Sequence, residues 1–282
     1  MTRRFDGRVA LVTGASRGIG EAIARRLAAE GASVVVHASP RSEPALVAVA
    51  DAIRRAGGIA APLVADLTDE RLVETLAAAA GRSFGPVDML INNAAGISAY
   101  APPGAIDAPA RRQMMMLNLE APVALCQQVL PGMHAQGWGR ILNIGSEMAR
   151  QPPVPYPGPA RFVHALGYYG VTKAALHRYT EALAAELSGS GVTANVLLPY
   201  KIVATEAAAA VVAQAAARNP DWIEPVEVMA EAAAWMLAST VTGQLAVSRN
   251  LLHQMQAGVH ALDGGARLGD ALLPYMTRGE TP

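Results

Sequence analysis

A glycine-rich turn near the start of the chain constrains its fold more than any other feature of the sequence. The turn follows a short apolar run at residues 9–13 and leads into a segment with helical spacing of its apolar residues. Its three glycines are Gly14, Gly18 and Gly20. Between a strand and a helix, such glycines permit a sharp turn, close approach of the backbone to a phosphate, and tight packing of helix on sheet. The turn therefore predicts dinucleotide binding, with a purely structural tight turn as the alternative.

Apolar runs alternate with helical patterns along most of the chain. Strands are predicted at residues 9–13, 33–37, 59–64, 87–92, 140–144 and 193–198. Helices are predicted at residues 19–30, 43–56, 71–80, 111–136 with an interruption near Pro131, and 169–187. Strands and helices in this alternation form parallel sheets through right-handed crossovers. The pattern predicts one α/β domain over residues 1–282, a Rossmann-type doubly wound parallel sheet with helices on both faces.

Two segments compete for the last strand of this sheet. Residues 245–248 follow Gly243 closely, whereas residues 259–263 lie beyond a stretch with helical character at 250–256. We expect the strand at 245–248 and an atypical ending over 245–282. His253 and His260 are interpreted as packing or surface residues, and no His, Cys, Asp or Glu cluster has metal-ligand spacing, so no catalytic metal is predicted.

Composition and charge argue against several classes of protein. The 282 residues are 52% hydrophobic, with 23 basic and 23 acidic side chains, which favours a globular domain without a nucleic-acid or polybasic membrane surface. Neither a signal peptide nor a run of eighteen apolar residues is found, so no membrane association is predicted. The single cysteine, Cys126, fits a buried thiol in a reducing compartment, which predicts a cytoplasmic location.

Lysine is nearly absent from the chain, and the two that remain stand out. Of the 23 basic residues, only Lys173 and Lys201 are lysines. Lys173 follows Tyr169 by four residues in a predicted helix, so both side chains lie on one face. A phenol beside an ammonium can donate and accept a proton near neutral pH, because the cation favours the ionised phenol. Alone, the pair also fits an incidental feature of a helix surface.

The residues after the second predicted strand bear on the choice of dinucleotide. A carboxylate there would accept hydrogen bonds from the ribose hydroxyls of NAD, but none occurs before Glu43. Arg17 and Arg41 can instead donate to a 2′-phosphate, and Ser39 can hydrogen-bond it. NADP(H) is therefore favoured, with NAD(H) and a solvated surface role for Arg41 as the alternatives.

With these residues identified, residues 5–243 resemble the short-chain dehydrogenase/reductase family. The Gly-rich turn matches the family's cofactor motif, and Asn118, Ser146, Tyr169 and Lys173 match its catalytic set in order. The resemblance implies that Tyr169 exchanges a proton with a carbonyl or alcohol oxygen while hydride moves, and that Ser146 hydrogen-bonds that oxygen. It implies that Lys173 lowers the Tyr169 pKa and holds the nicotinamide ribose, and that Asn118 anchors a proton-relaying water.

The resemblance also implies a wider cofactor site. Asp66 matches the residue that contacts the adenine, and Asn92, Asn93 and Ala94 match the end of the fourth strand, with Ala95 inserted before the expected glycine. The candidate cofactor-binding residues are Gly14, Ser16, Arg17, Gly18, Ile19, Gly20, Ser39, Arg41, Asp66, Leu67, Asn92, Ala94, Tyr169, Lys173, Pro199 and Ile202.

Two departures from the family pattern adjoin the expected active site. Ser146 and Tyr169 enclose a Pro-rich insertion at about 150–167, which fits a rim of the substrate pocket, a ligand for a partner domain, or a tolerated insertion. The Pro-Gly expected after the sixth strand is replaced by Pro199-Tyr200-Lys201. Lys201 is either a solvated lysine or a group that attracts an anionic substrate. The candidate substrate-contacting residues are Met148, Tyr200 and Lys201.

The resulting prediction is an NADP(H)-dependent oxidoreductase that interconverts a ketone or aldehyde and an alcohol. The alternatives are a cofactor-binding regulatory or scaffold protein with little turnover, and an enzyme of the same family that reduces a C=N or C=C bond. The resemblance implies a homodimer or homotetramer whose helices after Asn118 and through Tyr169 form the interfaces, although their apolar faces would equally fit a core.

Overall fold

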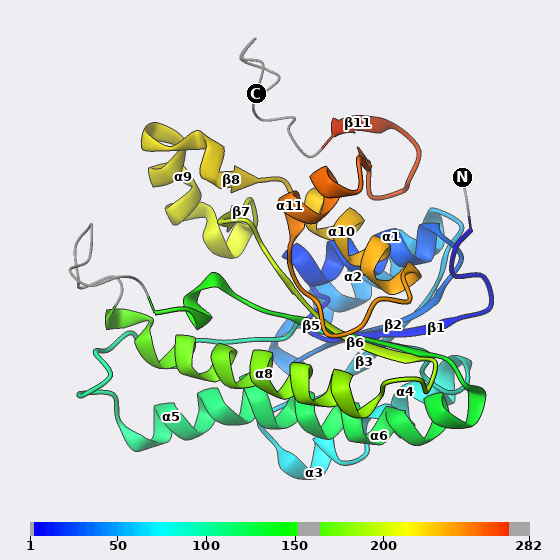
Figure 1. Cartoon of the computed structure of the whole chain (residues 1–282), viewed down its shortest axis with the longest axis horizontal. Helices are drawn as coiled ribbons and strands as arrows, with labels where there is room; N and C mark the ends of the chain where they lie inside the picture. The colour runs from blue at the N-terminus through cyan, green and yellow to red at the C-terminus, as the bar shows by residue number, and fades with distance from the viewer. Residues whose placement is uncertain (1–2, 152–163, 271–282) are drawn as a thin grey trace.

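A seven-stranded parallel sheet forms the centre of the computed structural model, which describes residues 3–151 and 164–270 (Figure 1). The strand order is β3-β2-β1-β4-β5-β6-β9, and every pairing is parallel. The strands are β1 (Val9–Val12), β2 (Ser33–Ala38), β3 (Ile59–Val64), β4 (Met89–Asn92), β5 (Gly139–Ile144), β6 (Val192–Leu198) and β9 (Leu245–Val247). The predicted doubly wound sheet is confirmed, including the last strand at its predicted place.

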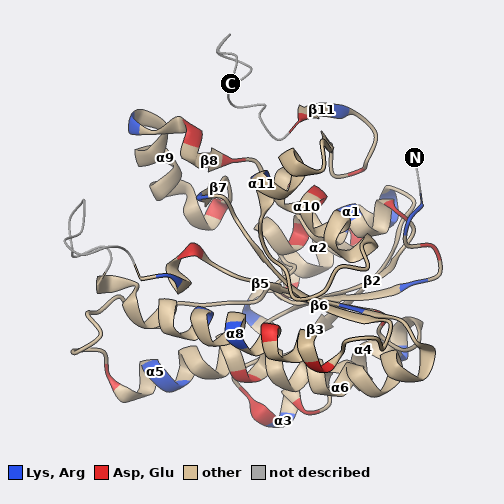
Figure 2. Ribbon diagram, viewed as in Figure 1, with Lys and Arg blue, Asp and Glu red and all other residues tan. Residues whose placement is uncertain are grey.

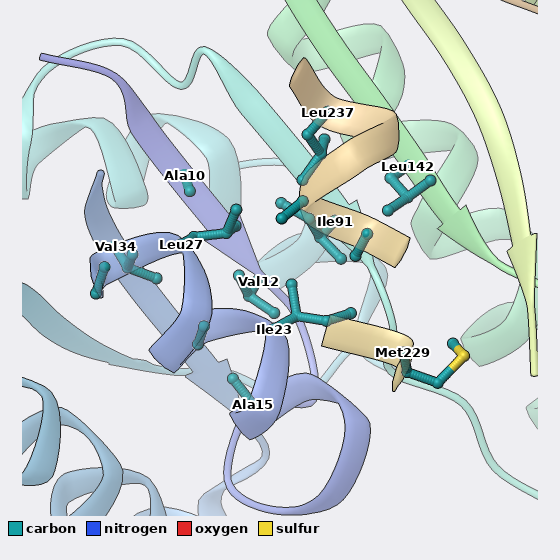
Figure 3. Close-up of a cluster of buried hydrophobic side chains, with 14 of the residues drawn as sticks. Ala10, Val12, Ala15, Ile23, Leu27, Val34, Ile91, Leu142, Met229 and Leu237 are labelled. Carbon is teal, nitrogen blue, oxygen red and sulfur yellow. The ribbon is translucent and has the colours of Figure 1, made fainter. Parts of the chain in front are cut away.

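Helices cover both faces of the sheet. One face carries α1 (Gly18–Ala29), α2 (Glu43–Arg55) and α10 (Val226–Ala238), and the opposite face carries α4 (Leu76–Phe84), α6 (Ala121–Gln136) and α8 (Gly167–Glu186) (Figure 1). Figure 3 shows how Ile23 and Leu27 of α1 and Met229 and Leu237 of α10 meet β1 and β4 over the first face. Strands buried on both faces explain the continuous apolar runs in the sequence.

The long helix predicted at residues 111–136 is interrupted, but not at Pro131. α5 (Ala108–Met115) passes into a wider π-helical turn, η2 (Met116–Glu120), and then into α6. α6 continues through Pro131, so the predicted interruption is wrong at that place. Proline removes one helical hydrogen bond, but α6 buries Val129 and Met133 on either side of it, and this packing keeps the helix intact. Similarly, the helix predicted at 71–80 is divided into α3 (Glu70–Val73) and α4.

Smaller elements lie beyond the carboxyl ends of β5 and β6. η3 (Glu147–Ala149) follows β5, and a two-stranded ribbon of β7 (Ile202–Val203) and β8 (Ile223–Glu224) follows β6. Between β7 and β8 lie η4 (Glu206–Ala208), α9 (Ala209–Arg218) and η5 (Pro220–Trp222), which project from the body of the molecule (Figure 1).

After β9 the chain forms a short helix and a two-stranded ribbon. α11 (Ser248–Gln254) matches the helical character predicted at 250–256. The competing strand candidate forms β10 (Gly258–His260), which pairs antiparallel with β11 (Arg267–Asp270) outside the main sheet. His260 Nδ1 lies 3.1 Å from Glu231 Oε2 of α10, so this histidine helps to dock the ending on the body.

Charged residues of both signs are distributed over the helices and loops of the ribbon (Figure 2). No helix within residues 3–151 and 164–270 is both long and apolar enough to span a bilayer. In the same part of the chain, no three His, Cys, Asp or Glu side chains are grouped as a metal site would need. Cys126 is buried, as predicted.

Candidate active site

The Gly-rich turn between β1 and α1 has a shape that only glycine permits at two places. Gly14 has a φ of +65°, and a Cβ there would lie 2.8 Å from Ala94 Cα. A Cβ on Gly20 would lie 2.4 Å from the carbonyl oxygen of Gly14. No side chain caps the N-terminus of α1 at Arg17, so the first backbone N–H groups of the helix have no such partner. This cradle has the backbone donors and the close access that a dinucleotide diphosphate requires.

The end of β4 holds the turn in place through Asn93 rather than Asn92. Asn93 Nδ2 donates to the carbonyl oxygens of Thr13 at 2.9 Å and Gly14 at 3.0 Å. Thr13 Oγ1 accepts from the backbone N–H groups of Asn93 and Ala94, both at 3.0 Å. Asn92, the predicted residue, is 2% exposed. Its side chain donates to Asn143 Oδ1 at 2.8 Å, away from the turn. In the sequence, Asn93 is identified only through the match of residues 92–94 to the family's strand end, and it is given no role of its own.

At the other end of the cradle, Arg41 and Asp66 lie near each other. Arg41 lies in η1 (Pro40–Ser42), after Ser39, and is exposed like Arg17. Asp66 accepts from the Thr68 backbone N–H at 2.9 Å and from its hydroxyl at 2.8 Å. These bonds, with the nearby charge of Arg41, hold the pKa of Asp66 below its usual value. The carboxyl ends of β2 and β3 thus bring a cation and a carboxylate together.

The four predicted catalytic residues come from three elements that meet beyond β5. Ser146 lies directly before η3, and Tyr169 and Lys173 lie in the first turns of α8. The side chains of Ser146 and Tyr169 are hydrogen-bonded to each other. Lys173 is 2% exposed, and its Nζ lies 5.9 Å from the centre of the Tyr169 ring.

Asn118 lies within the π-helical turn and is fully buried. Its Oδ1 accepts from the Gly96 N–H at 2.9 Å, and its Nδ2 donates to the Gly96 carbonyl at 3.0 Å and to Thr172 Oγ1 at 3.1 Å. Both amide protons are therefore used, and only one Oδ1 lone pair and the backbone carbonyl remain for a water. Asn118 thus joins the loop after β4 to α8. Its partner on α8 is Thr172, three residues after Tyr169 in the sequence.

Burial dominates the titration of the tyrosine and the lysine. It raises the pKa of Tyr169, with Tyr100 acting in the same direction and the hydrogen bond to Ser146 opposing both. Burial also lowers the pKa of Lys173 to about 8. The expected lowering of the Tyr169 pKa by Lys173 is not found here. The Lys173 ammonium instead donates to the Ile144 carbonyl at 2.8 Å.

Comparison with known proteins matches this arrangement to one family. Residues 8–216 match the family model for short chain dehydrogenases. The chain belongs to the short-chain dehydrogenase/reductase family. It is 34% identical over 203 residues to a short chain dehydrogenase of Pseudocercospora fijiensis, which aligns 71% of this chain and 61% of the relative. The chain thus spans less than two thirds of that relative's length.

Two further members of the family are similar to this chain. The 3-oxoacyl-(acyl-carrier-protein) reductase of Escherichia coli is 34% identical over 195 residues, covering 69% of this chain and 73% of the relative. A solved structure of a 3-oxoacyl-(acyl-carrier-protein) reductase from Agrobacterium tumefaciens, with NADP bound, is 32% identical with a TM-score of 0.74. That alignment covers 86% of this chain and 93% of the other.

Against this family pattern, the altered loop after β6 has a polar support of its own. The Tyr200 backbone N–H donates to Glu224 Oε1 at 3.0 Å, and the Ser248 hydroxyl donates to the same atom at 2.8 Å. Glu224 is fully buried, and its burial raises its pKa. The Arg249 guanidinium lies 4.5 Å from the centre of the Tyr200 ring. The loop is therefore anchored to Glu224 of β8 and, through Ser248 and Arg249, to α11.

Lys201 forms an ion pair with Glu147. Its Nζ lies 2.7 Å from Glu147 Oε2, and the two side chains are 38% and 37% exposed. Glu147 directly follows Ser146, so the ion pair joins the rim of the site to η3. The Glu147 carboxylate offsets the Lys201 charge, and attraction of an anionic substrate by Lys201 stays a prediction.

The remaining predicted residues lie around these groups. A Cβ on Gly170 would lie 2.4 Å from the Met148 carbonyl oxygen, so η3 packs closely on α8. Thr205, a residue not among the predicted cofactor ligands, lies over the turn, because its Cγ2 would be 3.2 Å from a Cβ on Gly18. Pro199 and Ile202 precede it on the same segment. Most of the Pro-rich insertion, residues 152–163, lies outside the described residues.

Proposed function

We propose that this chain is an NADP(H)-dependent oxidoreductase that interconverts a ketone or aldehyde and an alcohol. The observation that supports it best is the hydrogen bond between the Ser146 and Tyr169 side chains, with Lys173 four residues further along the same helix. The cradle of Gly14 and Gly20 fits the diphosphate, and Arg41 beside Asp66 offers a donor to a 2′-phosphate. The related reductase with bound NADP supports the same cofactor.

In this proposal, bound NADP(H) supplies the hydride for reduction or accepts it in oxidation. Tyr169 donates its phenolic proton to the carbonyl oxygen in reduction, so that the C=O bond becomes C–OH and the phenol becomes a phenolate. The raised pKa of Tyr169 keeps the phenol protonated and ready to donate. In oxidation the phenolate takes the proton from the alcohol. Ser146 donates a hydrogen bond to the same oxygen and stabilises its developing negative charge.

Lys173 and Asn118 support this proton transfer. Lys173 holds the end of β5 through the Ile144 carbonyl and places a cation near the forming phenolate. Asn118 fixes the loop after β4 against α8, and its remaining acceptors can hold a relaying water. A homodimer or homotetramer and a cytoplasmic location remain part of the proposal.

Turnover of NADPH over a panel of ketones, aldehydes, imines and activated alkenes tests this function. We expect carbonyl-dependent oxidation of NADPH, slower oxidation of NADH, and loss of activity in Tyr169→Phe. Cofactor binding without turnover on any compound would favour the regulatory or scaffold alternative. Turnover confined to the imines or alkenes would favour reduction of a C=N or C=C bond.

A further inference from the structure

Three side chains on one face of α8 hold the end of β5 that leads to Ser146. Lys173 Nζ donates to the Ile144 carbonyl at 2.8 Å, and Thr180 Oγ1 accepts from Asn143 Nδ2 at 2.8 Å. Between them, His177 Nε2 accepts from the backbone N–H of Ser146 at 3.4 Å. Residues spaced by three and four lie on one side of a helix, so the three bonds form a row along the strand end.

His177 reaches Ser146 because the residue before the serine is glycine. A Cβ on Gly145 would lie 2.3 Å from His177 Nε2 and 2.7 Å from Val196 Cγ1 of β6. Any side chain at position 145 would therefore push the imidazole away from the strand. His177 is 7% exposed, so water competes little for its ring nitrogen.

The surroundings of His177 favour its neutral form. Burial lowers its pKa to about 4, and the positive charges of Lys173 on its own helix and Arg150 after η3 act in the same direction. On the β6 side, the residue that adjoins Gly145 is the apolar Val196. A neutral imidazole that accepts at Nε2 carries its proton on Nδ1. Protonation at Nε2 would place a donor against the Ser146 N–H and break this bond.

We propose that His177 is a positioning residue for the proposed reaction, which orients Ser146 toward Tyr169 by accepting its backbone N–H. The inference rests on the proposed function, since it gives Ser146 a role at the reacting oxygen. Ser146 has an extended backbone, and its Oγ also accepts from the Met148 N–H at 3.2 Å. Loss of the His177 bond removes one of the bonds that hold Ser146, so the hydroxyl shifts from the position where Tyr169 meets it.

Two substitutions separate the hydrogen bond from the bulk of the side chain. His177→Leu keeps an apolar group of similar size and removes the acceptor, and we expect kcat to fall at least about tenfold with little change in KM. His177→Gln can place an amide oxygen near the position of Nε2, and we expect it to retain most of kcat. Thr180→Val is the matched control, because it removes the neighbouring bond to Asn143, and we expect lower stability with kcat within about twofold.

Two kinetic outcomes would overturn the proposal. One is a His177→Leu enzyme that keeps the wild-type kcat, and the other is a His177→Gln enzyme as impaired as His177→Leu. Nitrogen-15 NMR of histidine-labelled protein tests the geometry without turnover. We expect His177 as the Nδ1–H tautomer at pH 7, and an Nε2–H tautomer would contradict the proposal. If the wild type turned over no compound, the proposed function would fail, while the tautomer would still decide the His177 geometry.

Discussion

The two ends of the candidate active site are built in different ways. At the Gly-rich turn, backbone shape determines the site, because Gly14 and Gly20 lie against neighbouring backbone with no room for a side chain. At the rim after β6, side chains from distant segments determine the shape, since Glu224 holds Tyr200 and Lys201 reaches back 54 residues to Glu147. The candidate site thus combines a turn fixed by close backbone contacts with a rim held by side-chain contacts between distant segments.

Alanine at Gly14 gives the largest expected effect on this contrast. The substitution forces a positive φ on alanine and places its Cβ 2.8 Å from Ala94 Cα. We expect a loss of about 1–3 kcal/mol in stability and at least about 100-fold weaker NADPH binding, measured by urea unfolding and calorimetry. Gly7→Ala is the control, because Gly7 has a φ of +75° but no atom within 4 Å of the added Cβ. Equal effects of the two substitutions would show that close packing at the turn is unimportant.

Removal of the buried carboxylate tests the other end. Glu224→Ala leaves the Tyr200 N–H without its acceptor, and we expect about 1–3 kcal/mol lower stability and a raised KM for the carbonyl compound. NADPH affinity should change much less than in Gly14→Ala. Glu224→Gln keeps an acceptor and should lose less. A Glu224→Ala protein with unchanged KM would show that the bond between Glu224 and the Tyr200 N–H does not shape the place where substrate binds.

Acid should lower the stability of the protein through His37, a buried histidine next to the Gly-rich turn. His37 is 1% exposed, its carbonyl accepts from the Ala15 N–H at 2.8 Å, and burial lowers its pKa to about 4. In the unfolded chain, His37 binds a proton near its ordinary pKa of 6.5, whereas in the folded protein it stays neutral until about pH 4. The free energy of unfolding therefore falls as the pH drops from 6.5 toward 4, and His37 does not lower it above that range. We expect the wild type to lose about 2 kcal/mol more than His37→Gln between pH 7 and 5. Parallel losses in urea unfolding of the two proteins would exclude His37 as the cause.

The smallest effect is expected at Lys201. Its ion pair with Glu147 is more than a third exposed, and such pairs contribute about 0–1 kcal/mol. Lys201→Ala should therefore leave thermal stability and the KM for uncharged ketones nearly unchanged. If Lys201 attracts an anionic substrate, KM rises only for carbonyl compounds that carry a carboxylate or phosphate. An unchanged KM for those compounds would leave Lys201 with no part in substrate binding.

Local patterns predicted the sheet, the turn and the Tyr169–Lys173 pair, because each depends on residues close together in the sequence. Contacts between distant segments were not predictable in this way. Asn93, His177 and Glu224 owe their positions to partners 24 to 80 residues away, which no spacing rule encodes. Pro131 misled the prediction because helix packing outweighed its local preference. The pKa of Tyr169 was likewise not predictable from the sequence, because it is set by burial rather than by Lys173 along the helix.

The proton transfer assigned to Tyr169 is the central claim, and one comparison tests it most directly. Tyr169→Phe removes only the hydroxyl that is hydrogen-bonded to Ser146. We predict at least about 100-fold lower kcat for carbonyl reduction, with NADPH affinity within about twofold of the wild type. A Tyr169→Phe protein that reduces carbonyl compounds at the wild-type rate would contradict the account.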